Sequence, residues 1–184
     1  AVALILERAR ALSHPNLIVF DMHGEYTPLT AGKEPVASGF RIAGPAEDRG
    51  DQGTLFLPWW LLKQEEMQAL LLDRSEANAP NQAARLLHHV RELKHEQLIA
   101  EGRSDLAQRF TVDSPVPFSL DELVARLEAD DTEMVPGRSA PIAGPFKGKL
   151  TRFIARLRSR IEDRRYGFMF APPQSDVGYE WLHE

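Results

Sequence analysis

Three side chains that can hold a metal ion or move a proton follow one apolar segment of the sequence. Asp21, His23 and Glu25 come directly after Leu17-Ile18-Val19-Phe20. The apolar run predicts a buried strand, and in open α/β sheets the carboxyl ends of the strands face the ligand crevice. Alternate residues of an extended backbone share one side, so the imidazole and the two carboxylates would lie together. Such a group suits metal and phosphate chemistry.

A helix is predicted just before this strand. Apolar residues recur at helical spacing from Val2 to Leu12, and Ser13-His14-Pro15 then stops the helix. A helix that feeds a buried strand is half of a βαβ unit, and the strand that would precede it is missing before Ala1. We therefore expect this sequence to be a piece of a larger fold.

The remaining elements are predicted to be short strands up to residue 57 and mainly helices beyond it. Residues 27–51 are rich in Gly, Pro and Ala, and only Gly39–Gly44 has strand character there; Thr54–Leu57 predicts a second short strand. Amphipathic spacing then predicts helices over residues 63–72, 81–102, 120–127 and 150–161.

Three further features mark the ends of these helices. Ser119 followed by Glu122 is a capping-box pattern, which predicts a helix that begins at Leu120. Residues 130–145 are acidic and then rich in Pro and Gly, and predict a connector. Tyr166–Phe170 predicts a strand before Pro172-Pro173.

Composition limits the classes of function. The chain has 184 residues, with 22 basic and 27 acidic side chains and a net charge of -5, so a surface for nucleic acid has to be local. Cysteine is absent, which excludes disulfides, thiolate zinc sites and cysteine nucleophiles, and is typical of a cytoplasmic protein. No apolar run reaches membrane length, so no membrane partner is expected.

A phosphate-binding loop is not found in this sequence. Gly148-Lys149 follows a segment with Gly and Pro, but Leu150 replaces the required hydroxyl residue and Ala143 stands where the motif needs Gly. No other Gly-Lys dipeptide precedes Ser or Thr, so the chain alone is predicted not to hydrolyse ATP.

A metallophosphatase site at Asp21 and His23 is a less favoured alternative. Asp21-x-His23-Gly24 looks like the first metal motif of that family, and Asp48-Arg49-Gly50 resembles part of the next one. Two metals about 3.5–4 Å apart need a bridging carboxylate, but the matching position is Pro45, which has no ligand atom.

A third interpretation rests on a family resemblance. Ile18-Val19-Phe20-Asp21-Met22-His23-Gly24-Glu25-Tyr26, preceded by a helix, resembles the segment just after the Walker A helix of HerA-type hexameric DNA-translocating ATPases. Leu57–Leu62 and Leu71–Gln82 resemble the helical insertion of bacterial members. The resemblance implies that the Walker A motif would lie just before Ala1 and the Walker B strand after Glu184.

The resemblance implies an α/β fold with a large α-helical insertion, that is, a partial RecA/FtsK-like P-loop ATPase core plus a helical bundle. Residues 1–57 would belong to the core, 58–165 would be the insertion, and 166–184 would return towards the core. The intact protein would bind ATP and Mg²⁺, form a hexameric ring and couple hydrolysis to DNA translocation or unwinding. The fragment alone is expected to be inactive and to bind neither ATP nor Mg²⁺.

Asp21 is the residue to which the resemblance gives a catalytic role. It would sit beside the nucleotide phosphates, where a carboxylate can orient the metal's water or the attacking water. His23 and Glu25 are weaker catalytic candidates, and local hydrogen bonding at a strand end explains them equally well. A second class of function stays open, in which the helical insertion is a non-enzymatic docking module for a partner nuclease or other effector.

The helical region carries further candidates with open interpretations. Trp59-Trp60 predicts packing anchors rather than a base-stacking platform, and His88-His89 predicts surface histidines without the i, i+4 geometry of a metal pair. Four cations, Lys149, Arg152, Arg156 and Arg160, follow one flank of a predicted helix. Only Glu162 and Asp163 are nearby in sequence to neutralise them, so this basic edge would contact nucleic-acid phosphates, face a neighbouring subunit, or be merely the solvated side of the helix.

Overall fold

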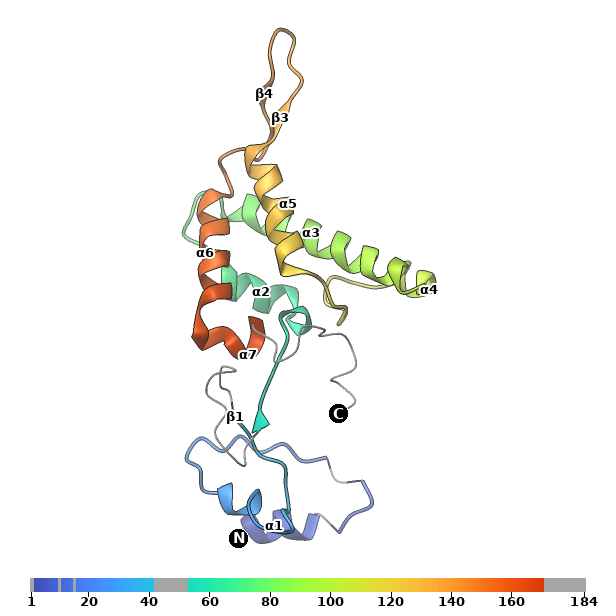
Figure 1. Cartoon of the computed structure of the whole chain (residues 1–184), viewed down its shortest axis with the longest axis vertical. Coiled ribbons are helices and arrows are strands. Elements are labelled where there is room, and N and C mark those ends of the chain that lie inside the picture. Colours follow the sequence, from blue (N-terminus) through green and yellow to red (C-terminus); the bar gives the residue numbers. More distant parts are fainter. Residues whose placement is uncertain (1, 10, 15, 42–52, 171–184) are drawn as a thin grey trace. The chain divides into compact units, whose positions relative to one another are not determined.

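The computed structural model describes residues 2–9, 11–14, 16–41 and 53–170. The chain divides into two compact units, Ala1–Phe56 and Leu57–Glu184. Most of the described secondary structure is helical, and each of two small sheets has two strands (Figure 1).

The first unit has little regular structure. Its elements are helix α1 (Val2–Ala9), the 3-10 helix η1 (Thr27–Leu29) and strands β1 (Phe40–Arg41) and β2 (Gly53–Thr54). The two strands are parallel, with Phe40 opposite Gly53 and Arg41 opposite Thr54. The predicted helix is therefore found, and it ends at Ala9. Strand β1 lies within the strand predicted at Gly39–Gly44, of which residues 42–44 lie outside the described residues, and β2 shares only Thr54 with the strand predicted at Thr54–Leu57.

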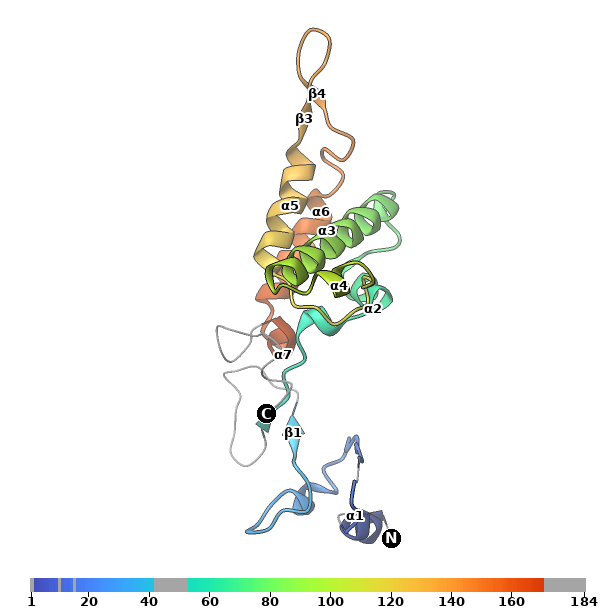
Figure 2. The same ribbon diagram turned by 90° about the vertical axis from the view of Figure 1, so that its right-hand side faces the viewer.

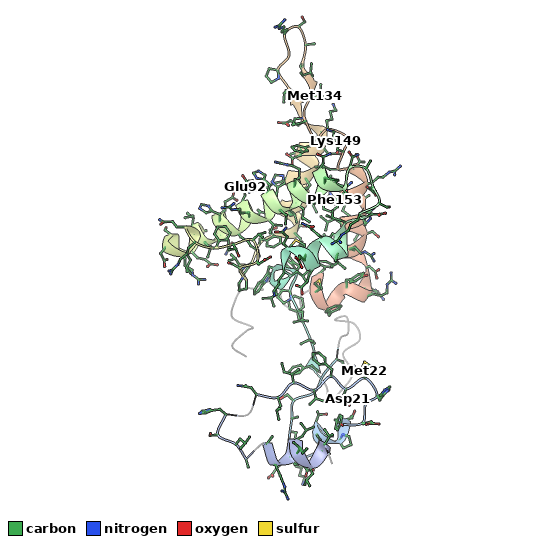
Figure 3. All side chains as sticks on the ribbon, turned by 180° about the vertical axis from the view of Figure 1, so that it is seen from behind. Asp21, Met22, Glu92, Met134, Lys149 and Phe153 are labelled. Carbon is green, nitrogen blue, oxygen red and sulfur yellow. The ribbon has the colours of Figure 1, made fainter. Side chains whose placement is uncertain are left out.

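The strand predicted at Leu17–Phe20 is wrong. These residues form no strand, and the side chains of Ile18 and Phe20 are 85% and 90% exposed. A strand needs a neighbouring backbone to satisfy its N–H and C=O groups, and no described residue outside this segment provides one. The apolar side chains from Leu17 to Phe20, together with Met22, consequently remain exposed within this unit (Figure 3).

The second unit is a bundle of helices. Its principal elements are α2 (Gln64–Leu71), α3 (Ala79–Ala100), α5 (Leu120–Thr132) and α6 (Thr151–Glu162). The α3 helix packs against α5, and α6 packs against both α5 and α2 (Figures 1 and 2). The shorter elements are η3 (Trp59–Leu61), α4 (Ser104–Ala107), η4 (Arg164–Tyr166) and α7 (Gly167–Phe170).

The apolar stripes predicted for these helices are confirmed as the core. Met67 and Leu71 of α2 are buried, as are Phe153 and Leu157 of α6. Trp60 is fully buried and Trp59 packs against the core, while its indole N–H donates to the carbonyl of Phe118 at 3.0 Å, so the tryptophan pair does anchor packing. Core side chains with 0% exposure are Trp60, Leu86, Val90, Leu127, Leu150, Phe153 and Leu157.

Side chains cap both α5 and α6. The Ser119 hydroxyl accepts the N–H of Glu122 at 3.2 Å, as predicted, but the Glu122 carboxylate pairs with Arg126 at 3.1 Å instead of completing a capping box. At the start of α6, the Asp131 carboxylate accepts the N–H of Leu150 at 2.7 Å and the hydroxyl of Thr151 at 2.6 Å. A carboxylate near the end of α5 thus caps the start of α6.

The segment predicted to be a connector is more ordered than expected. The α5 helix continues to Thr132, and strands β3 (Met134–Val135) and β4 (Ile142–Ala143) then form an antiparallel hairpin. The hairpin extends away from the helices beyond the end of α5, with Met134 48% and Ile142 56% exposed (Figures 1, 2 and 3).

The strand predicted at Tyr166–Phe170 is also wrong. The carboxylate of Asp163 accepts the N–H of Arg165 at 3.0 Å, which starts η4, and α7 follows directly. Met169 and Phe170 are buried in the helical conformation. The local cap and this burial outweigh the strand preference of the aromatic residues.

Among the described residues, no helix combines the length and the apolar character needed to cross a membrane.

Candidate functional site

The predicted catalytic residue Asp21 holds a tight turn. Its Oδ1 accepts the N–H of Glu25 at 3.1 Å, and its Oδ2 accepts the N–H of Tyr26 at 2.9 Å. Gly24 has a φ of +73°, a left-handed conformation that favours glycine, and its carbonyl accepts the hydroxyl of Thr27 at 3.0 Å. The loop from residue 21 to residue 27 therefore closes on the Asp21 carboxylate.

The same hydrogen bonds set the charge of Asp21. The N–H of Tyr26 is the main cause that lowers the pKa of this carboxyl group; desolvation opposes it as the next largest effect, and the N–H of Glu25 lowers the pKa further. Asp21 is exposed and remains ionised at neutral pH. Each carboxylate oxygen has two lone-pair sites, so the side chain can still accept a bond from a metal-bound or attacking water.

His23 and Glu25 do not line up with Asp21 on an extended strand as predicted. The backbone bends and turns through residues 22–26, and the Asp21 carboxylate binds the backbone of Glu25 rather than any group of its side chain. Both side chains are exposed. Asp21 and His23 belong to no three-ligand metal cluster in the part of the chain that the structure describes, and Pro45 and Asp48 lie outside it.

The segment that resembles a phosphate-binding loop is occupied by a carboxylate. Gly148 has a φ of +72°, and its N–H donates to the carbonyl of Asp131 at 3.0 Å. The Asp131 carboxylate takes the N–H of Leu150, a group that a phosphate oxygen would need at this helix end. The start of α6 is therefore capped by the protein itself.

The four cations of the basic edge divide into two pairs. Arg156 forms an ion pair with Glu76 and a longer one of 3.9 Å with Asp73, both from the loop before α3. Arg160 donates to the hydroxyl of Tyr166 at 2.9 Å and stacks 5.1 Å from the centre of its ring. Both guanidinium groups are thus held within the chain: Arg156 by loop carboxylates that are far away in sequence, and Arg160 by the nearby Tyr166.

Lys149 and Arg152 form the other pair. Both side chains are exposed, and neither has a hydrogen bond or an ion pair to any other described residue. The positive charges of Lys149 and Arg152 are therefore not neutralised by a carboxylate of any described residue, as the sequence indicated. The same expectation is wrong for Arg156.

A buried polar cluster that the sequence did not indicate joins α3 to α5. His89 is only 5% exposed, and its Nε2 lies 2.7 Å from Oδ2 of Asp130. Arg85 donates to both Asp130 oxygens, at 2.6 and 3.0 Å. Burial raises the pKa of Asp130, but the hydrogen bonds from Arg85 and His89 outweigh it and hold the pKa below its usual value. The prediction of a surface histidine is wrong for His89, because Asp130 is 41 residues away and only the packing of α5 brings it near.

Lys94 is a second buried polar group outside the predicted sites. Its ammonium group is fully enclosed and donates to the carbonyls of Val112 at 2.8 Å, Ser114 at 2.7 Å and Trp60 at 3.4 Å. Burial lowers the pKa of Lys94 from 10.5 to about 8, against the opposing effect of the Asp113 carboxylate. One side chain thus ties α3 to η3 and to the loop between α4 and α5.

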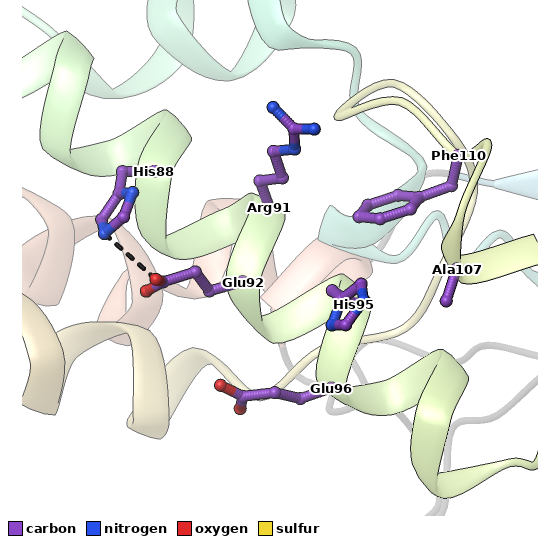
Figure 4. Close-up of a pocket in the computed structure, with 7 residues that line it drawn as sticks. All are labelled: His88, Arg91, Glu92, His95, Glu96, Ala107 and Phe110. Atoms are coloured by element: carbon purple, nitrogen blue, oxygen red, sulfur yellow. Dashed lines mark ion pairs between the residues drawn. The ribbon is translucent and has the colours of Figure 1, made fainter. Parts of the chain in front are cut away.

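A shallow depression of about 560 Å³ lies beside the exposed flank of α3 (Figure 4). Its lining residues are His88, Arg91, Glu92, His95, Glu96, Ala107 and Phe110. His88 and Glu92 meet in an ion pair of 3.2 Å. The depression is open and polar, unlike the enclosed apolar pockets that bind most small molecules.

Comparison with known proteins gives one family match. A search of curated proteins finds no significant match to this sequence. Residues 1–178 match the family described as "Helicase HerA, central domain". The match includes the Asp21 turn and the whole described helical unit, and the chain therefore belongs to the HerA helicase central-domain family.

Proposed function

We propose that this chain is part of a HerA-like ATPase that couples ATP hydrolysis to DNA translocation or unwinding in a hexameric ring. Residues 1–57 would contribute to a RecA/FtsK-like P-loop core, residues 58–165 would form its helical insertion, and residues 166–184 would return to the core. The family match over residues 1–178 is the observation that carries this proposal.

The Asp21 turn supplies the proposed catalytic group. Its ionised, exposed carboxylate is oriented by two backbone N–H groups, which is the preorganisation that water positioning requires. Magnesium bound to ATP would neutralise part of the phosphate charge, and Asp21 would orient a water molecule bound to that magnesium ion. His23 and Glu25 are exposed on the same turn and would serve as secondary polar contacts.

The isolated chain is proposed to be inactive because its sequence contains no Gly-x-x-x-x-Gly-Lys-Ser/Thr motif. The Asp131 cap at α6 supports this, since it occupies the most similar loop. The purified chain should show no magnesium-dependent ATP turnover above background. Stoichiometric turnover that Asp21→Ala abolishes would overturn the assignment.

The decisive test uses the full-length protein. Asp21→Ser keeps an oxygen that can cap the turn but removes the carboxylate, whereas Asp21→Ala removes both. Both variants should lower ATP turnover by about a hundredfold or more, with assembly retained in the Ser variant. Glu34→Gln, an exposed carboxylate change in the same unit, is the control and should leave turnover unchanged. Normal turnover in Asp21→Ser would reduce Asp21 to a turn-forming residue.

A second function for the helical unit is favoured by the β3–β4 hairpin. Its exposed Met134 and Ile142 offer an apolar contact for a nuclease or other effector protein. Replacing both by Ser should leave ATP turnover and DNA binding intact while weakening effector binding, if docking uses this hairpin. Equal effector binding by the double variant would remove the hairpin from the docking surface.

A further inference from the structure

The flank of α3 holds a group of metal-binding side chains that the proposed ATPase function does not use. The ligand atoms of His88, His89 and Glu92 all lie within 4.8 Å of one another. Nε2 of His88 is 3.2 Å from Oε1 of Glu92, and Nδ1 of His89 is 3.5 Å from Oε2. Zinc bonds of about 2.0–2.2 Å place tetrahedral ligand atoms about 3.3 Å apart, which is close to both separations.

The ring orientation of His89 is the second observation that points to a metal. Nε2 of His89 lies 2.7 Å from Asp130 and 3.1 Å from a guanidinium nitrogen of Arg85 that already donates to Asp130. Because an ionised carboxylate can only accept, the shorter contact assigns the proton to Nε2 of His89. The other ring atom, Nδ1, is buried and has no hydrogen-bond partner among the described residues. A histidine held by a carboxylate through one nitrogen, with the other facing ligand groups, is the usual arrangement of a metal-binding histidine.

Glu92 is available for such an ion because its arginine neighbour has other partners. Arg126 approaches Glu92 at 3.8 Å but binds Glu96 at 2.6 Å and Glu122 at 3.1 Å. Glu92 can therefore turn to a cation without leaving the Arg126 guanidinium unpaired. His88 is 47% exposed and free to rotate by the small amount that would bring its ring into line.

We propose that His88, His89 and Glu92 bind one Zn²⁺ ion, with Asp130 as the positioning residue for His89. Two imidazole nitrogens with one carboxylate form a ligand set that suits zinc, whereas magnesium and calcium prefer oxygen ligands alone. Three protein ligands would leave a fourth position for water, and two of them, His88 and Glu92, line the depression (Figure 4). Through Asp130, the ion would strengthen the packing of α3 against α5.

Titration of the 184-residue chain with ZnCl₂ by calorimetry tests this site. We expect one saturable site per chain, and His88→Ala and Glu92→Gln should each weaken it at least about tenfold. Both side chains are partly exposed, so these variants should remain folded. His95→Ala is the matched control, since His95 is exposed on the same helix and lines the same depression but lies outside the ligand group.

Thermal unfolding gives an independent measurement. At a free Zn²⁺ concentration of about 100 times the dissociation constant, the unfolding midpoint should rise by about 5 °C or more. The rise should be reversed by a chelator and be absent in Glu92→Gln. Absence of a one-to-one site, equal binding by His88→Ala, or equal weakening by His95→Ala would overturn the proposal. None of these results depends on whether the full-length protein hydrolyses ATP.

Discussion

Lys94 shows how a single residue controls the stability of the helical unit. Its carbonyl acceptors are Val112 and Ser114 in the loop between α4 and α5, and Trp60 in η3. These oxygens would otherwise be buried unpaired, while the charge of Lys94 is costly to enclose. The depressed pKa reflects this cost. A group whose folded pKa lies below its unfolded value destabilises the fold while it is protonated in both states.

The first prediction is that stability depends on pH through Lys94. Between pH 8 and pH 10.5 the folded chain gives up the Lys94 proton while the unfolded chain keeps it, so the free energy of unfolding rises across this window, by at most about 3 kcal/mol. Urea unfolding at pH 7.5, 9 and 10 measures it. Lys94→Met should remove this contribution, while the exposed Lys147→Met should not.

Lys94→Met is also expected to lower stability at pH 7. The carbonyls of Val112 and Ser114 would lose their donor, at a cost of about 1–3 kcal/mol for each buried oxygen, which exceeds the relief from removing the buried charge. A variant more stable than the original chain at pH 7 would show that the charge penalty dominates.

The residue scale also shows what the sequence could and could not reveal about the site. The Asp21-to-Tyr26 string indicated both the family and the candidate carboxylate, because motif spacing is a local property. The hydrogen bonds that the Asp21 carboxylate accepts from the backbone depend on the turn at Gly24, whereas the sequence pattern indicates an extended backbone there. The pairing of His89 with Asp130 depends on helix packing over 41 residues, for which the sequence offers no signal.

At the scale of elements, α6 depends on a cap from another helix. Asp131→Ala would leave the N–H of Leu150 and the hydroxyl of Thr151 without an acceptor. We expect a loss of about 1–2 kcal/mol in the free energy of unfolding. Asp105→Ala, which removes an exposed ion pair of 3.4 Å with Arg109, is the control and should cost less than about 0.5 kcal/mol. Similar losses for both variants would contradict the capping role.

The basic edge of α6 gives a prediction that separates binding from stability. If the full-length protein acts on DNA as a hexamer, as we propose, Lys149→Gln with Arg152→Gln should weaken DNA binding equally for all sequences and lower the salt slope by about one unit per lost phosphate contact. Arg156→Gln should instead lower the unfolding midpoint, because it breaks the ion pair with Glu76. An unchanged salt slope with intact hexamers would make Lys149 and Arg152 solvated residues, and loss of the hexamer alone would place them between subunits.

The elements that could be predicted are those whose own residue pattern is enough to identify them. Helices α2, α3, α5 and α6 follow from apolar residues at spacings of three and four, because one helix face must be buried. The two failed strands, Leu17–Phe20 and Tyr166–Phe170, have suitable residue types. A strand also requires a partner backbone, which a sequence segment does not specify by itself.

At the scale of the whole molecule, the apolar core belongs to the second unit. Every buried residue of the main cluster lies between Trp60 and Leu157. Residues 57–184 alone should therefore unfold cooperatively, with a midpoint within a few degrees of that of the complete chain. Circular dichroism during thermal unfolding checks this, and Leu127→Ala should lower the free energy of unfolding by about 2–5 kcal/mol. A non-cooperative transition of the shorter chain would show that residues 1–56 are needed for the core.

The core joins residues that are far apart along the chain, and this affects how the protein is made. Trp60 enters the same cluster as Phe153 and Leu157, so the early helices cannot complete the burial of their apolar faces until α6 has been synthesised and has left the ribosome. During that interval α2, α3 and α5 expose the residues that later form the interior. Slow translation before residue 157 would prolong this exposure, and synthesis of a chain truncated there should yield a product that chaperones retain.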